Sequence, residues 1–395
     1  MQTTNYRKIT LLFAVLLSVA ATKAQDLKNT FNPEQYGVTS LAIAPDARGG
    51  SMGDIGAATE ADIYAQYWNP AKYPFNVARA GVGISYTPWL RKLVNDINLA
   101  NITGFYRIGD YSAVSASLRY FSLGEVYLSG SDDTTIKPYE LAVDVGYSRM
   151  LSQCFSMGVN LRFIFSDVMV DPYNAASSPG KAFAADIAMY RLGYFMMGNR
   201  ECSLGWGINI SNIGSKIAFG GDDNAEFIPT NLRLGLNFTV PFNEYNKISL
   251  AVDANKPLIP TYPKQKEGEE TVDYQDRIQR EYYDVSPIVG IFKSFGDAPG
   301  GFKEEMQEIR WSIGCEYTYN DRFMVRVGYH HEAENKGNRK YFTVGAGFHM
   351  SVFTIDAAYC FSTAQTNPLD QTMRFSLGFD LDGMRDLFGK MRRRR

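Results

Sequence analysis

The residues best suited to chemistry in this chain are three histidines and four cysteines. His330 and His331 are adjacent in an alternating stretch, so their side chains point to opposite faces of a strand and do not share a metal site. His349 lies apart from them, and the cysteines match no metal-site spacing. No Ser-His-Asp or Cys-His signature accompanies these residues. We therefore expect no enzyme, no metal site and no cofactor.

The cysteines leave one question open. Cys154 and Cys202 fall at short turns that the strand pattern places on one side of a membrane. In an oxidising compartment they either form a disulfide or stay as two free thiols, and the bridge is a hypothesis. Cys315 and Cys360 lie within strands on opposite phases of the alternation, and we do not expect them to pair.

The N-terminus predicts export. Arg7 and Lys8 precede the apolar run 9–21, and small residues at 22 and 24 predict cleavage after Ala24, which makes residues 1–24 a signal peptide. The run is shorter than the roughly 20 residues that span a bilayer, and no later run reaches that length. The net charge of −2 indicates no nucleic-acid partner.

Strands of alternating character follow. Between Tyr139 and Tyr147, one face is aromatic and aliphatic and the other carries Glu140, Ala142 and Asp144. Similar segments recur to the end of the chain, and 14% of all residues are aromatic, which suits the interfacial girdles of a membrane barrel. A soluble sandwich also alternates. The export signal, the segment length and the small or charged opposite face favour the barrel.

Loop lengths give an independent count of the strands. Short turns face the periplasm in such barrels, and long loops face outside. The two kinds alternate only if residues 256–309 form a single external excursion. The sequence therefore predicts an all-β fold, a 14-stranded antiparallel transmembrane β-barrel spanning residues 77–381 (an even strand count, as such barrels have).

The external excursion has two parts. Residues 264–284 are strongly charged, and we interpret them as a solvated loop. A short amphipathic helix follows behind Pro287. Its apolar residues, with a later phenylalanine, are Ile288, Ile291, Phe292, Phe295 and Phe302. This face either folds over the barrel rim or docks a partner protein.

Residues 25–76 precede the first strand and are predicted to form a hatch in the lumen. Their glycines allow close backbone approach and lack the strand and helix of a phosphate-binding loop. A lumen of about 14 strands is wide enough to need filling. The hatch residues singled out are Gly49, Gly50, Gly53, Gly56, Asn69, Pro70 and Ala71.

Residues 382–395 form a basic amphipathic periplasmic tail in this interpretation. Its apolar residues at helical spacing are Met384, Leu387, Phe388 and Met391. Such a helix suits the inner leaflet of the outer membrane, and a periplasmic partner is the alternative. The lumen charges are expected to pair with each other or with the hatch. They are Asp144, Arg162, Asp186, Arg233, Glu316, Arg326 and Arg374.

Two segments carry a family resemblance. ARGGSMGDIG at 47–56, followed by Asn69, Pro70 and Ala71, resembles the hatch of the FadL-like superfamily of long-chain fatty-acid transporters. With WNPAKYPF at 68–75 and SFGDAPGGFKEE at 294–305, the chain resembles the PorV (LptO) family of the Bacteroidota type IX secretion system. The likeness runs from about residue 35 to the end.

The resemblance implies an outer-membrane carrier without catalytic chemistry. Such carriers take cargo proteins bearing a conserved C-terminal signal domain from the SprA translocon. They deliver them to the attachment complex of the sortase PorU with PorQ and PorZ, amid outer-membrane lipid and lipopolysaccharide. The alternative is a FadL-like transporter of hydrophobic small molecules across the outer membrane. A lipopolysaccharide-modifying enzyme and a soluble β-protein rank below both.

Overall fold

The computed structural model describes residues 31–128, 134–168, 178–220, 224–266, 268–350, 352–362 and 369–383. The predicted signal peptide and the tail residues Met384, Leu387, Phe388 and Met391 lie outside these residues.

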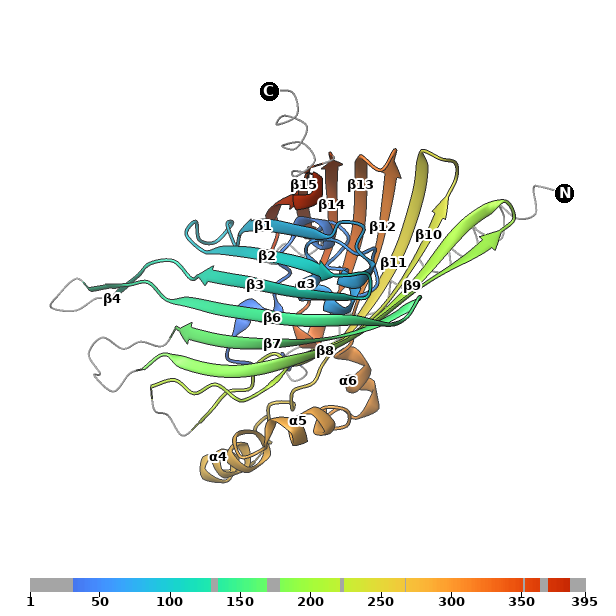
Figure 1. Cartoon of the computed structure of the whole chain (residues 1–395). Coiled ribbons are helices and arrows are strands. Elements are labelled where there is room, and N and C mark those ends of the chain that lie inside the picture. The colour runs from blue at the N-terminus through green and yellow to red at the C-terminus, as the bar shows by residue number, and fades with distance from the viewer. Residues whose placement is uncertain are drawn as a thin grey trace.

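Within the described residues, fourteen antiparallel strands form one closed barrel (Figure 1). The strands are β1 (Ala80–Pro88), β2 (Asn98–Ile108), β3 (Ser112–Ser122), β6 (Tyr139–Ser152), β7 (Phe155–Asp167), β8 (Gly180–Met197), β9 (Arg200–Gly214), β10 (Asn231–Pro241), β11 (Asn246–Pro257), β12 (Arg310–Tyr319), β13 (Phe323–His331), β14 (Lys340–His349), β15 (Phe353–Ser362) and β16 (Met373–Asp380). Each pairs with its neighbours in sequence, and β1 closes the ring against β16. The short hairpin β4 (Val126–Leu128) and β5 (Thr134–Ile136) lies in the loop between β3 and β6. The predicted fold class is confirmed.

The two faces of each strand differ as the alternation predicts. In β6, Val143 and Val145 are exposed on the outer face, whereas Ala142 and Asp144 are buried toward the lumen. An apolar outer face is what contact with lipid requires, because hydrocarbon offers no partner to polar groups.

The connections fall into two classes at the two ends of the barrel. Turns of two to four residues join β2 to β3, β6 to β7, β8 to β9, β10 to β11, β12 to β13 and β14 to β15. Longer loops gather at the other end, and the longest runs from 258 to 309 between β11 and β12. By the usual asymmetry this second end is external.

The N-terminal segment runs inside the barrel (Figure 1). Its short helical elements are η2 (Thr39–Ala42), α2 (Ala47–Gly50), α3 (Ala65–Trp68) and η3 (Pro70–Phe75). Elements this short are not stable alone in water, so their conformation depends on packing against the wall.

The external excursion is more helical than the sequence predicts. It contains α4 (Thr271–Ile278), the π-helical turn η4 (Gln279–Tyr283), α5 (Pro287–Lys293) and α6 (Phe302–Gln307), and η5 (Glu334–Lys336) lies in the neighbouring loop. The short helix after Pro287 is found, but the interpretation of 264–284 as a loop is wrong. Arg277 pairs with Glu269 across the start of α4, and Tyr282 of η4 is buried.

The hypothesised disulfide is wrong, since all four cysteines are free. The carbonyl of Cys154 accepts a hydrogen bond from Leu192 of β8, whereas Cys202 in β9 pairs with Phe195 on the other side of β8. Two strand spacings of about 4.8 Å therefore separate them. A disulfide needs Cα atoms within roughly 7 Å.

Candidate functional site: the lumen segment and the external helices

The lumen segment is organised around one tryptophan. Trp68 is buried, and its indole Nε1 donates to Oδ1 of Asp46 at 2.6 Å. The other carboxylate oxygen of Asp46 caps α2 by accepting from the N–H of Gly49 at 2.8 Å. One buried carboxylate therefore ties the start of the segment to its end.

The four predicted glycines lie where side chains do not fit. A Cβ on Gly49 or Gly56 would lie 2.3 Å or 2.2 Å from the Trp68 ring. A Cβ on Gly50 would lie 2.3 Å from the guanidinium of Arg374. Gly53 has φ +80° and lies against the backbone of β13. Glycine is thus required for close approach at three positions and for backbone conformation at the fourth.

Asn69, Pro70 and Ala71 form the entry to η3. The side-chain Oδ1 of Asn69 accepts from the N–H of Ala71 at 3.1 Å, and Pro70 occupies the first turn, where its missing N–H costs nothing. The Asn69 amide also donates to the carbonyl of Met189 in β8 at 2.9 Å. This residue therefore both caps η3 and fixes it to the wall.

Further bonds join the segment to strands around the ring. Asp253 of β11 accepts from the N–H groups of Gly56 and Ala57 at 2.9 and 3.0 Å. Thr343 of β14 accepts from Gly53 at 2.8 Å, and Ser376 of β16 accepts from Ala47 at 2.8 Å. The segment is thus held by several strands far apart in the sequence.

The seven lumen charges are placed as expected. Arg162 pairs with Asp144 and Asp186, and Arg326 pairs with Glu316 at 2.5 Å. Arg374 pairs with Asp54 of the lumen segment at 2.7 Å. Arg233 is different, because it donates to backbone carbonyls of the segment and to Asn255 rather than to a carboxylate.

Several lumen residues were not singled out from the sequence. Lys72 is fully buried and donates from Nζ to the carbonyl of Gly56 at 2.8 Å. Arg48 bridges Asp62 and Glu316. The sequence did offer a signal for both residues, because Arg48 lies in the glycine-rich stretch 47–56 and Lys72 in the proline-containing stretch 68–75. A charged residue in an internal segment needs a buried partner.

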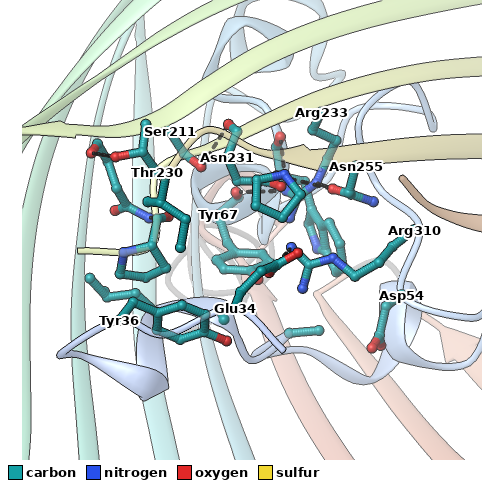
Figure 2. A pocket seen from close by; sticks show the side chains of 18 of the residues that line it. Glu34, Tyr36, Asp54, Tyr67, Ser211, Thr230, Asn231, Arg233, Asn255 and Arg310 are labelled. Atoms are coloured by element: carbon teal, nitrogen blue, oxygen red, sulfur yellow. Dashed lines mark hydrogen bonds and ion pairs between the residues drawn. The ribbon is translucent and has the colours of Figure 1, made fainter. Parts of the chain in front are cut away.

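A polar cavity of about 80 Å³ lies on the external side of this segment. Figure 2 shows Tyr67, Arg233 and Arg310 among the side chains that line it, with Glu34 beside Arg310. Its wall combines the lumen segment with residues of β3, β6 and β7 and with the external ends of β9 to β14.

The external excursion presents an apolar surface. This outer apolar surface comprises Ile288, Val289, Phe292, Phe295, Phe302 and Met306, all at least half exposed. Phe292 and Phe302 are 75% and 80% exposed. Of the predicted docking residues, only Ile291 is partly buried. Helix α5 instead rests on the barrel through Gly290, whose missing side chain admits Phe227 and Pro260.

Buried ion pairs hold α6 against the barrel. Lys256 of β11 contacts Glu305 at 2.9 Å and also Glu308. Lys336 of η5 contacts Glu304 at 2.8 Å and Glu308 at 3.0 Å. These side chains fix the base of the excursion while its phenylalanines stay exposed.

A second anchor lies beneath η4. Lys216 donates from Nζ to the carbonyls of Tyr282 and Tyr283 at 3.0 and 2.8 Å and lies 4.0 Å from the Phe227 ring centroid. Burial lowers the pKa of Lys216 to about 8, and burial raises the pKa of the neighbouring Glu226 carboxyl. The hydroxyl of Tyr282 donates to the carbonyl of Gln35, so the excursion also touches the lumen segment.

Comparison with known families decides the identity of this barrel. The family model described as "Type IX secretion system protein PorV" matches residues 28–264, more than half of the chain. The chain belongs to the PorV family. With the barrel fold, this membership makes the protein an outer-membrane component of the type IX secretion system. The family consists of secretion proteins, not of known enzymes.

A solved structure shows the same fold as this PorV-family chain. A TodX deltaS2S3 mutant monoaromatic hydrocarbon channel matches with a TM-score of 0.50 and 13% identity, covering 85% of this chain and 98% of that one. A Pseudomonas aeruginosa FadL homologue matches with a TM-score of 0.43 and 12% identity, covering 89% and 99%. A search of curated proteins gave no significant match. The structural likeness at this identity concerns the fold alone.

Proposed function

We propose that this PorV-family protein is the outer-membrane carrier of type IX secretion. It takes cargo bearing the conserved C-terminal signal domain from the SprA translocon and delivers it to the attachment complex of PorU, PorQ and PorZ. The observation that carries the proposal is the outer apolar surface, which is exposed on helices that buried ion pairs hold to the rim. An exposed apolar patch on a rigid base is typical of a protein docking site.

The interior supports a carrier more than a channel for hydrophobic molecules. An apolar solute needs an apolar passage. The external cavity is instead lined by side chains such as Glu34, Arg119 and Arg233. In this proposal residues 25–76 act as a hatch that closes the lumen, residues 1–24 are removed as a signal peptide, and residues 382–395 lie at the periplasmic face.

A pull-down tests the docking role. The tagged full-length protein is purified in mild detergent from its native outer membrane, and co-purified proteins are identified by mass spectrometry. We expect a very large barrel or surface proteins that share a C-terminal domain. The Phe292→Asp/Phe302→Asp variant should recover at least about tenfold less of them, because aromatic anchors dominate docking energy.

The matched control is Leu93→Asp, which changes another exposed apolar residue in a different external loop. It should recover as much partner as the wild type. Recovery of a monomer that holds lipid or fatty acid and no protein would contradict the proposal and favour the hydrophobic-molecule transporter.

A further inference from the structure

Two buried arginines line the external cavity without a carboxylate partner. Arg119 of β3 and Arg233 of β10 are 4% and 7% exposed. Within the part of the chain that the structure describes, neither forms an ion pair, although the other lumen arginines named above do. Burial of a cation without a counter-charge is costly, so the absence of a carboxylate partner at both arginines calls for an explanation.

Tyr67 brings the two arginines together. The guanidinium carbons of Arg119 and Arg233 lie 4.8 Å and 4.9 Å from the centroid of its ring. Stacking on an aromatic ring orients a planar guanidinium and leaves its N–H edge free to bond. Tyr67 is itself a lining residue of the cavity (Figure 2).

Each guanidinium uses only part of its bonding capacity. Arg119 donates from Nη1 alone, to the carbonyls of Ser40 and Ile43. Arg233 donates from Nε to Asn255 at 2.9 Å and from Nη1 to carbonyls of the lumen segment. Among the described residues, no bond is formed by Nε or Nη2 of Arg119 or by Nη2 of Arg233. These donors remain for the cavity that both side chains line.

Two of the three acidic residues that line the cavity, Asp54 and Asp144, are already engaged. Asp54 bonds to Arg374, and Asp144 bonds to Arg162. Glu34 faces Arg310 at 3.7 Å, too far for a hydrogen bond, and Nε of Arg310 is buried with no partner. An incoming anion therefore meets two guanidinium groups that form no ion pair among the described residues.

We propose that this cavity binds one oxyanion group, a carboxylate or a phosphate, through Arg119 and Arg233. Arginine binds both groups through paired N–H donors. A volume of about 80 Å³ suits such a group, since a cavity needs roughly 10–15 Å³ of such space to hold one water molecule. The inference stands independently of the carrier role.

Tryptophan fluorescence tests the proposal, because the Arg233 guanidinium lies 4.7 Å from a Trp68 ring. Trp89, Trp206 and Trp311 are replaced by phenylalanine in the full chain, which leaves Trp68 as the only reporter. Inorganic phosphate is titrated at constant ionic strength against chloride. We expect a saturable change, weakened at least about tenfold by Arg119→Gln or by Arg233→Gln, since each removes a charge-assisted bond. Arg280→Gln, at an exposed position of η4, is the matched control and should leave the titration unchanged.

Further probes separate the sources of the group. Acetate and N-acetylglycine present a free and a chain-borne carboxylate, and glycerol phosphate presents a chain-borne phosphate. Saturable binding of any of them that is lost in both arginine variants supports the proposal. A change that follows ionic strength alone, or binding retained in both variants, overturns it. If the variants do not fold, selenate in wild-type crystals gives the same decision, since an anomalous peak is expected beside Arg119 and Arg233 and its absence there overturns the site.

Discussion

The indole Nε1 of Trp68 lies 2.6 Å from Oδ1 of Asp46, and both side chains are buried inside the barrel. The same carboxylate caps α2 through Gly49. Two stretches of the lumen segment 22 positions apart are therefore one packed unit. Changes that displace the ring should loosen the segment as a whole.

Gly56→Ala tests this dependence. The new Cβ would lie 2.2 Å from the Trp68 ring, so the ring or the backbone must shift, and we expect its bond to Asp46 to weaken. We expect the variant to raise ion conductance in planar bilayers above that of the wild type. Gly296→Ala is the control, because no atom lies within 4 Å of its added Cβ. An unchanged conductance in a folded Gly56→Ala barrel would show that the lumen segment closes the pore without this packing.

Arg326→Met tests the buried ion pairs of the wall. Arg326 is 1% exposed and bonds to Glu316 at 2.5 Å and Asp356 at 2.6 Å. Its loss leaves the buried Asp356 without its ion-pair partner and leaves Glu316 with Arg48 alone. We expect a loss of about 3–5 kcal/mol in the free energy of unfolding, measured by urea denaturation in lipid vesicles. Lys92→Met is the comparison, because Lys92 is exposed where it pairs with Asp370. We expect it to leave the midpoint of urea denaturation unchanged. Equal effects of both substitutions would contradict the assignment.

Lys256→Met tests how the excursion is fixed. The substitution removes the ion-pair partner of the buried Glu305 and leaves Glu308 with Lys336 alone, so α6 should detach more often. We expect limited proteolysis within residues 258–309 to become at least about tenfold faster, while the barrel stays resistant. Lys303→Met, on the exposed side of α6, should not change the rate. Unaltered cleavage in Lys256→Met would mean that other contacts hold the helix.

Lys216 predicts a pH dependence of the same excursion. Its pKa falls to about 8 in the folded protein from an ordinary value of 10.5, because burial disfavours the charged form. Below pH 8 the ammonium is charged in both the docked and the undocked state, and the docked state bears the full desolvation cost. That cost disappears as the pH rises from 8 to 10.5, so docking is expected to strengthen over this window.

The measurement is the rate of proteolysis near Tyr282 as a function of pH, corrected with an unfolded peptide. The wild-type rate should fall between pH 8 and 10.5. Lys216→Met should show no such fall, because it keeps the contact with Phe227 and removes the titrating group. A fall of the same size in both proteins would assign the effect to another group.

Much of the barrel could be predicted because membrane strands obey simple periodicity. Val143 and Asp144 point to opposite sides because successive side chains of a pleated strand alternate. Loop parity required 256–309 to be one connection, and the observed loop runs from 258 to 309. The inward charges could be named, but not the partner of each. Arg48 meets Glu316 across 268 positions, and no local pattern encodes such a contact.

The sequence predictions were wrong where the outcome depends on contacts between distant segments, about which local sequence patterns give no information. The charged residues of 264–284 led to the prediction of a loop, although part of this stretch is helical. Arg277 and Glu269 stabilise the helix by an ion pair, and the sequence alone does not distinguish such a pair from separate solvated charges. The cysteine hypothesis failed because strand β8 lies between Cys154 and Cys202. The outward direction of the α5 phenylalanine depends on Gly290, whose contact with Phe227 is set by tertiary packing.

The bonds from the lumen segment to β8, β11, β14 and β16 act as spokes in a wheel. A ring of strands alone can flatten into an ellipse, whereas a ring with internal ties to distant points keeps its cross-section. A load applied to the helices outside the rim is therefore shared by the whole circumference, not borne by the two strands that flank them. The internal bonds thus make the barrel stiffer than its wall alone would be.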